Sequence, residues 1–299
     1  MARPILTGRL SHVAIASYLA PAGALRTLLP GGLADEVEID APHPHLSAPV
    51  GSDLGVVSLV GQTLSELRVM GVGIPTQRTG ADLSLQVHVR QGDRRGVVVV
   101  KRFVSRPLLA LVARKRLGEA AEVQRLKPEI AHGPRTLRVS YELQFQPRMV
   151  VPGPGQVARP DGSPGTYRLS LEGTKPSVRA DAESLSHALK ETRWVFSPGV
   201  AAQRGGGPGG ANGAATTAGS TGGVMIHECL HPVWSIHPVT GVQVEMDFGN
   251  LFGVDWGFLN GQTPGAGVLA VGSEVAIFGR RPTVQVLWGQ RRQTHKSSG

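Results

Sequence analysis

The residues best suited to chemistry lie in the segment 224–238, which holds three of the ten histidines, the only cysteine and one of the four tryptophans. The five residues from His227 to His231 have the HExxH pattern of zinc proteases. On a helix, this pattern puts two histidines on one face to bind zinc, and the glutamate activates the bound water. His237 stands at the spacing of a third ligand. One hypothesis is therefore a metal-dependent hydrolase at His227, Glu228 and His231.

Two residues oppose a helix in this segment. Pro232 directly follows His231, and a residue before proline is sterically pushed out of the α region. Trp234 stands where zinc proteases of this type need a glycine to turn the chain. The residues that open the segment are apolar, partly β-branched, and follow a glycine-rich tract. We therefore predict a strand with His227 and Cys229 on the same face as His231, and we expect no bound metal.

Other common catalytic and cofactor-binding patterns do not occur in the sequence. It has no Gly-x-Ser-x-Gly motif, no P-loop and no GxGxxG motif between a strand and a helix. We therefore expect no cofactor. One cysteine excludes an intrachain disulfide framework and fits a cytoplasmic location. No apolar run reaches the roughly 18 residues of a membrane-spanning helix, so we expect no membrane span.

The formal net charge is +9, and basic residues are concentrated between positions 90 and 138. Thirteen lysines and arginines in this segment face only four acidic residues, which favours an anionic partner. Aromatic residues make up 5% of the chain and do not alternate with the basic ones, as base-stacking modules require. Nucleic-acid binding is therefore disfavoured. A basic surface protein that contacts nucleic acid or acidic lipid remains the alternative hypothesis.

The middle of the chain shows the clearest local structure. Residues 81–90 alternate between apolar and polar side chains, which predicts a half-buried strand. Residues 91–96 form a predicted hairpin turn, and 97–104 form the return strand. The segment 105–117 predicts the best helix, with Ser105 as its cap and Gly118 at its end.

The remaining segments predict mostly strands. Two further short helices are expected at 21–30 and 181–190, and no βαβ repeat is present. The fold class is therefore mainly β (α+β), a large antiparallel barrel with two or three short helices. We expect one domain over 1–290, a flexible glycine-rich insertion at 199–223, and a disordered basic tail at 291–299.

Four segments together resemble a known family. They are GALRTLLPGGL at 23–33, the strand–turn–strand–helix run at 82–118, LSHALKETRW at 185–194, and LHPVW at 230–234. Their order and spacing are similar to those of the DUF2071 (YqjF-like) proteins, members of the acetoacetate decarboxylase-like superfamily. The resemblance implies a cone of strands around an apolar cavity. Such a cavity would bind a small organic molecule, in this case one that could be anionic, with or without catalysis.

The resemblance also implies site residues. Glu191 and His231 would be the catalytic pair, with His231 as proton donor or acceptor. Arg193 would pair with a carboxylate of the ligand. Trp194, Trp234 and Lys101 would complete the substrate-binding set.

The sequence departs from the decarboxylases themselves. They carry a lysine pair after the helix, and one of these lysines forms a Schiff base. The matching segment 118–122 has no lysine here. Decarboxylation through a Schiff base is therefore not expected, because Lys101 or Lys115 could supply an amine only from a different position. Whether the protein is an enzyme, and whether it forms a homo-oligomer, stay open.

Overall fold

The structure is a computed structural model. It describes the residues 4–30, 32–42, 53–73, 79–147, 149–150, 159–160, 162–179, 194–198, 224–230, 234–272 and 274–279. The predicted helix at 181–190, the insertion at 199–223 and the tail at 291–299 lie outside these residues. No helix of the described part is long and apolar enough to cross a membrane.

Strands dominate the described chain, and the mainly β fold class is confirmed. The strands are β1 (Leu6–Pro21), β2 (Glu38–Ile39), β3 (Leu54–Val69), β4 (Val72–Gly73), β5 (Thr79–Gln91), β6 (Arg94–Val104), β7 (Ala121–Val123), β8 (Arg125–His132), β9 (Thr136–Phe145), β10 (Met149–Val150), β11 (Arg159–Pro160), β12 (Gly165–Thr174), β13 (Val178–Arg179), β14 (Trp194–Pro198), β15 (Val224–Leu230), β16 (Ser235–His237), β17 (Val239–Glu245), β18 (Ala266–Val271) and β19 (Glu274–Gly279).

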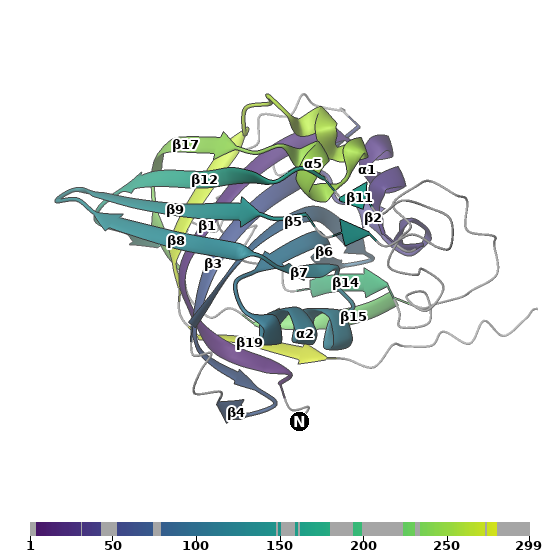
Figure 1. The fold of residues 1–299 in the computed structure, drawn as a ribbon, viewed down its shortest axis with the longest axis horizontal. Coiled ribbons are helices and arrows are strands. Elements are labelled where there is room, and N and C mark those ends of the chain that lie inside the picture. Colours follow the sequence, from purple (N-terminus) through teal and green to yellow (C-terminus); the bar gives the residue numbers. More distant parts are fainter. Residues whose placement is uncertain are drawn as a thin grey trace, which may run out of the picture.

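A closed barrel of seven strands forms the centre of the molecule (Figure 1). Going round the ring, the order is β1-β19-β15-β14-β6-β5-β3, and the ring closes because β1 also pairs with β3 along its whole length. The pairs are antiparallel except for β14 with β6, which run parallel. Closure leaves these strands with hydrogen-bonded neighbours on both sides, and it creates an inner and an outer face.

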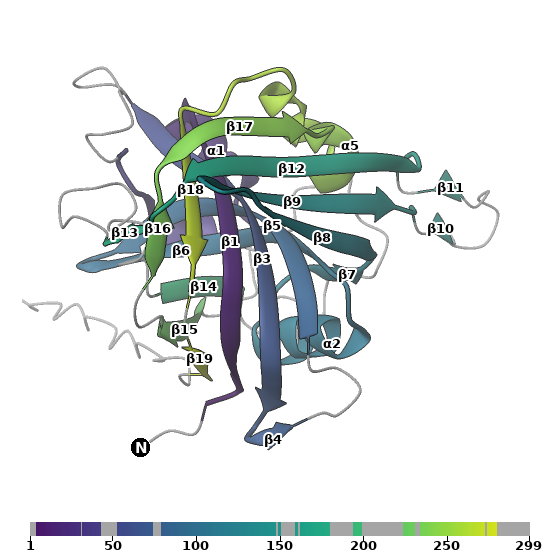
Figure 2. The same ribbon diagram turned by 90° about the vertical axis from the view of Figure 1, so that its left-hand side faces the viewer.

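A second, four-stranded sheet in the order β17-β12-β9-β8 covers one side of the outer face of the barrel (Figure 2). The larger hydrophobic core lies between these two layers. Leu83, Leu85, Val87 and Val89 of β5 all point into this core, as their alternation predicted. The polar side chains between them therefore face the barrel interior and not the outer solvent.

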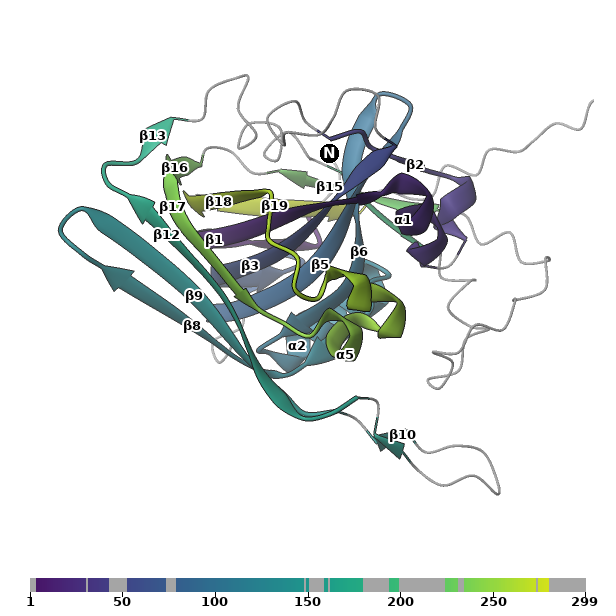
Figure 3. The same cartoon turned by 90° about the horizontal axis from the view of Figure 1, so that it is seen from above.

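Helices cover the ends and edges of the barrel (Figure 3). They are α1 (Ala22–Leu28), α2 (Pro107–Arg116) and α5 (Phe248–Phe252), with 3₁₀ turns at Leu33–Asp35 and Val254–Leu259. The sequence predicted α1 and α2 but not α5. Asp247 caps α5 by accepting a hydrogen bond from the N–H of Asn250 at 3.0 Å.

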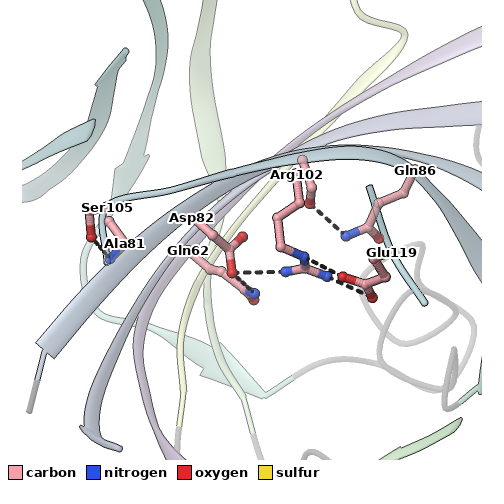
Figure 4. Close-up of polar contacts among 8 residues, drawn as sticks. Gln62, Ala81, Asp82, Gln86, Arg102, Ser105 and Glu119 are labelled. Atoms are coloured by element: carbon pink, nitrogen blue, oxygen red, sulfur yellow. Dashed lines mark hydrogen bonds and ion pairs between the residues drawn. The ribbon is translucent and has the colours of Figure 1, made fainter. Parts of the chain in front are cut away.

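The predicted cap of α2 is wrong. Arg106 occupies the N-cap position, and no side chain caps the helix. Ser105 instead accepts a hydrogen bond at Oγ from the N–H of Ala81, at 2.9 Å (Figure 4). The predicted end of the helix is confirmed, because Gly118 follows it with a φ of +67°.

Candidate functional site

The barrel interior contains a cavity of about 130 Å³. Its wall combines inward-facing residues of the barrel strands with one face of α2. Most of the lining is apolar: Leu6, Leu10, Val13, Ile15, Val60, Leu64, Val97, Val99, Val104, Leu109, Val112, Ala113, Leu117, Val195, Trp234, Val275 and Ile277. The polar lining residues are Ser58, Gln62, Asp82, Gln86, His88, Arg102, Glu119, His227 and Cys229. A few polar groups in an apolar enclosure are typical of a small-molecule site.

Arg102 is the centre of the polar part of the wall (Figure 4). Its Nε and Nη2 donate to the two carboxylate oxygens of Glu119, at 2.7 and 3.3 Å. Its Nη1 donates to Oδ2 of Asp82 at 2.9 Å, and the amide of Gln62 donates to the same oxygen at 2.6 Å. The side chains are 13%, 2% and 3% exposed for Arg102, Glu119 and Asp82. One buried cation therefore lies between two buried carboxyl groups.

A β-bulge in β6 turns Arg102 toward the cavity. Lys101 pairs with Leu85 and Val99 pairs with Gln86, so Val100 is an extra residue opposite this step of β5. Because of the extra residue, the inward side chain after Val99 is Arg102 and not Lys101.

Glu119 contacts Arg102 from the side of β6 that is opposite to β5. The turn at Gly118 reverses the chain after α2, and the N–H of Glu119 donates to the carbonyl of Ala113 at 3.0 Å. The N–H of Arg102 then donates to the carbonyl of Ala120 at 2.8 Å. These backbone bonds fix the carboxyl group of Glu119 beside the guanidinium group.

The pKa values of Asp82 and Arg102 are both raised, but for different reasons. Burial raises the pKa of Asp82, and this effect exceeds the lowering by Arg102 and Gln62. Burial by itself lowers the pKa of Arg102, but the charges of Glu119 and Asp82 raise it by more. Arg102 therefore stays charged, while Asp82 has an increased affinity for a proton. The second oxygen of Asp82, Oδ1, has no hydrogen-bond partner among the described residues.

The histidines and the cysteine of the cavity wall are uncharged near neutral pH. Burial lowers the pKa of His227 to about 4, with a backbone contact at Leu117 opposing the shift. It also lowers the pKa of His88 to about 4 and raises that of Cys229 to about 12. Nε2 of His88 lies 2.9 Å from Oγ of Ser58.

The described part of the HExxH segment, up to Leu230, is a strand, as predicted. Val224–Leu230 forms β15, with His227 and Cys229 on the cavity side. A strand does not place residues four apart on one helical face, so the geometry of a zinc protease is not present. No three His, Cys, Asp or Glu side chains of the described chain lie close enough together to hold a metal ion. His231 lies outside the described residues.

The structure places three of the six site residues that the sequence proposed. Trp234 is buried and lines the cavity. Trp194 is half-buried on β14, and the guanidinium carbon of Arg94 lies 5.2 Å from the centre of its ring. Lys101 lies on the other face of β6 from the cavity, with Nζ 3.1 Å from the carboxylate of Glu122. Glu191, Arg193 and His231 lie outside the described residues, so their roles remain predictions.

Asp82, Arg102, Glu119 and Gln62 were not among the site residues predicted from the sequence. One signal was available for Asp82, because it is a charged residue on a strand whose other face is apolar from Ala81 to Val89. Nothing in the sequence shows that these residues meet, since their contact depends on the pairing of β3, β5 and β6.

Ion pairs neutralise part of the charge of the basic segment. Six of its thirteen cations are in ion pairs: Arg90, Arg95, Lys101, Arg102, Lys127 and Arg138. Their partners include acidic residues from other parts of the chain, among them Glu38 and Glu172. This pairing reduces the charge that could attract a polyanion.

Comparisons with known proteins agree with the fold. The sequence model of DUF2071, described as an uncharacterized conserved protein, matches residues 7–205. No curated protein matches the sequence significantly.

Among solved structures, an acetoacetate decarboxylase-like enzyme from Sphingomonas wittichii RW1 is similar, with a TM-score of 0.56 and 11% identity over 93% of this chain and 92% of that one. Acetoacetate decarboxylase from Legionella pneumophila has a TM-score of 0.53 and 12% identity, over 93% and 87% of the two chains. The enduracididine biosynthesis enzyme MppR, complexed with the condensation product of pyruvate and imidazole 4-carboxaldehyde, has a TM-score of 0.56 and 11% identity, over 93% and 89%. These likenesses show a shared fold.

Proposed function

The chain belongs to the DUF2071 family, and from that premise we propose that it binds a small, neutral organic molecule inside its barrel. The observation that carries this proposal is the cavity itself. It is enclosed by barrel strands and α2, it is mostly apolar, and it has one polar cluster around Arg102. Solved structures with the same fold support it, since one of them, MppR, holds a small organic compound.

The size of the cavity limits the size of the ligand. A cavity of roughly 150 Å³ lined by apolar side chains can hold a benzene molecule. The cavity of about 130 Å³ found here is of that order. A ligand with about six or seven non-hydrogen atoms therefore fits without rearrangement of the barrel.

The charges of the wall favour a neutral ligand. Arg102 is the cationic side chain of the described lining, and it already contacts two carboxyl groups, those of Asp82 and Glu119. The histidines of the lining are uncharged near neutral pH, because burial lowers the pKa of both to about 4. An organic anion would therefore enter an apolar space beside two carboxyl groups, which is unfavourable. An anionic ligand would need Arg193, which lies outside the described residues.

Thermal unfolding in the presence of small cyclic probes tests the proposal. We expect cyclohexanone and toluene to raise the Tm in a saturable way, and cyclohexanecarboxylate to leave it unchanged. A ligand at 100 times its Kd stabilises the folded state by about 2.7 kcal/mol, which such an experiment resolves. A Tm increase only with the carboxylate, or with none of the probes, would contradict the proposal.

Two neighbouring residues of α2 provide a matched pair of variants. Val112 is buried and lines the cavity, whereas the side chain of Leu111 is 49% exposed. Val112→Phe should fill the cavity and abolish the effect of the probes, and Leu111→Phe should preserve it. Equal responses of the two variants would place the bound probe somewhere other than in the cavity.

A further inference from the structure

We propose that Asp82 is held as a neutral carboxylic acid and that its Oδ1–H donates a hydrogen bond to an acceptor oxygen of the ligand. The ligand class is then a small carbonyl compound, such as a ketone. This inference rests on the proposed function and adds to it the chemical group that the cavity recognises.

The hydrogen bonds of the cluster leave one carboxyl oxygen for a ligand. Glu119 takes two donors of Arg102, one on each of its oxygens. Asp82 takes one donor of Arg102, on Oδ2, and the amide of Gln62 donates to the same Oδ2. Oδ1 of Asp82 is buried and has no partner among the described residues, although Asp82 lines the cavity. Figure 4 shows Arg102 and Gln62 on the same side of the Asp82 carboxyl group.

A count of charges assigns a proton to this cluster. One guanidinium group lies between two carboxyl groups, and all three side chains are nearly excluded from solvent. With both carboxyl groups ionised, the apolar interior would hold an uncompensated negative charge, which is costly. One carboxyl group is therefore protonated. Arg102 gives two donors to Glu119 and one to Asp82, so the proton lies on Asp82.

No other group of the described wall supplies a second positive charge. The titratable side chains around Asp82 are Arg102, Glu119 and Tyr141. The hydroxyl group of Tyr141 bonds to Thr63, which lies on β3, the strand next to β5. His227 and Cys229 lie on β15, which two strands separate from β5 on one side of the ring and three on the other. Both are uncharged near neutral pH, since burial lowers the pKa of His227 and raises that of Cys229.

The neutral acid determines what the site recognises. A carboxyl O–H in an apolar enclosure is a strong donor, and it needs an acceptor to be satisfied. A carbonyl oxygen on an otherwise apolar molecule provides this acceptor and adds no charge. Enzymes with apolar sites use protonated aspartates in this way to bind a carbonyl or enolate oxygen.

Three probes with the same ring separate the alternatives. Cyclohexanone carries an acceptor oxygen, methylcyclohexane carries none, and cyclohexylamine is a cation. We expect the wild type to bind cyclohexanone about tenfold more tightly than methylcyclohexane, the gain of one hydrogen bond in a dry site. Tightest binding of cyclohexylamine would show an ionised Asp82 and would overturn the inference. Equal binding of cyclohexanone and methylcyclohexane would also overturn it, while the proposed function would stand.

Variants of Asp82 test the role of the proton directly. Asp82→Asn keeps the shape and offers an N–H donor to the cavity, so it should keep most of the preference for cyclohexanone. Asp82→Leu should lose the preference, and Asp93→Asn, in the exposed turn between β5 and β6, should behave as wild type. Loss of the preference in Asp82→Asn would contradict a donor at this position.

Infrared spectroscopy provides a test that needs neither a ligand nor the Asp82→Leu variant. At neutral pH, the difference spectrum between wild type and Asp82→Asn should contain the C=O band of a protonated carboxyl group. A difference spectrum with only carboxylate bands would refute the neutral acid, whether or not any probe binds.

Discussion

Acid should destabilise the protein in a way that depends on His227. The side chain is 2% exposed, and neither ring nitrogen has a hydrogen-bond partner of normal geometry among the described residues. Burial lowers the pKa of this histidine from 6.5 to about 4 in the folded protein. The unfolded chain therefore binds the proton more readily than the folded one. Stability that is fully present above pH 6.5 is lost as the pH falls toward about 4.

The size of this loss follows from the pKa difference. Each pKa unit corresponds to about 1.4 kcal/mol, so the complete shift is about 3 kcal/mol. At pH 5.5 the expected loss from His227 is about 1.4 kcal/mol, because one pH unit of the shift has then been crossed. His88 should contribute a loss over the same pH range, since burial lowers its pKa to about 4 as well. A variant is therefore needed to isolate the contribution of His227.

Urea unfolding between pH 4.5 and 8 measures the contribution. His227→Gln removes the titrating group, so its free energy of unfolding should fall less steeply with acid than that of the wild type. The difference in slope is the signal, because any packing defect shifts the whole curve equally. Parallel curves for wild type and His227→Gln would refute the argument from burial.

Replacing Arg102 with Met should cost about 3–5 kcal/mol, because it leaves buried carboxyl groups without their cation. In the same urea experiment, adding Glu119→Gln to that variant should recover part of the loss. Gly61→Ala should cost about 1–3 kcal/mol, because a Cβ there overlaps a buried tyrosine ring, whereas Gly23→Ala, with free space in α1, should gain about 0.5–1 kcal/mol. Cys229 should react with iodoacetamide at pH 8 far more slowly in the folded protein than in urea, since burial raises its pKa to about 12.

The strands could be predicted from the sequence because each depends on local alternation. The apolar positions of 81–90 define one face of β5, and Pro232 with Trp234 favoured a strand over a helix for β15. The barrel then follows from many antiparallel strands with few helices. The helix α5 was missed because its segment is rich in glycine, and its stability comes from tertiary contacts such as the bond between the N–H of Phe248 and the side chain of Asn260 at 2.7 Å.

The sequence did not reveal that the polar face of β5 lines the barrel interior. Alternation shows that one face of a strand is apolar and the other polar, and the usual interpretation places the polar face in water. In a closed barrel covered by a second sheet, the apolar face packs outward and the polar face lines the interior. Asp82 is therefore buried and His88 is half-buried, although their pattern in the sequence is that of a solvent-exposed strand face.

Lys101 and Arg102 show how one extra residue in a strand determines which side chain faces the cavity. With simple alternation along β6, the side chains of Val97, Val99 and Lys101 would all face the cavity. A lysine there would offer an amine to a carbonyl ligand. The extra residue Val100 shifts this order by one. Arg102 then faces inward, while Lys101 lies over the rings of the outer core, with Nζ 5.0 Å from the centre of Phe103. A bulge is a property of two paired strands and leaves no mark in a single sequence. It exchanges an amine that could form a Schiff base for a guanidinium that cannot, and so it places an acid–cation cluster where a nucleophile would otherwise be.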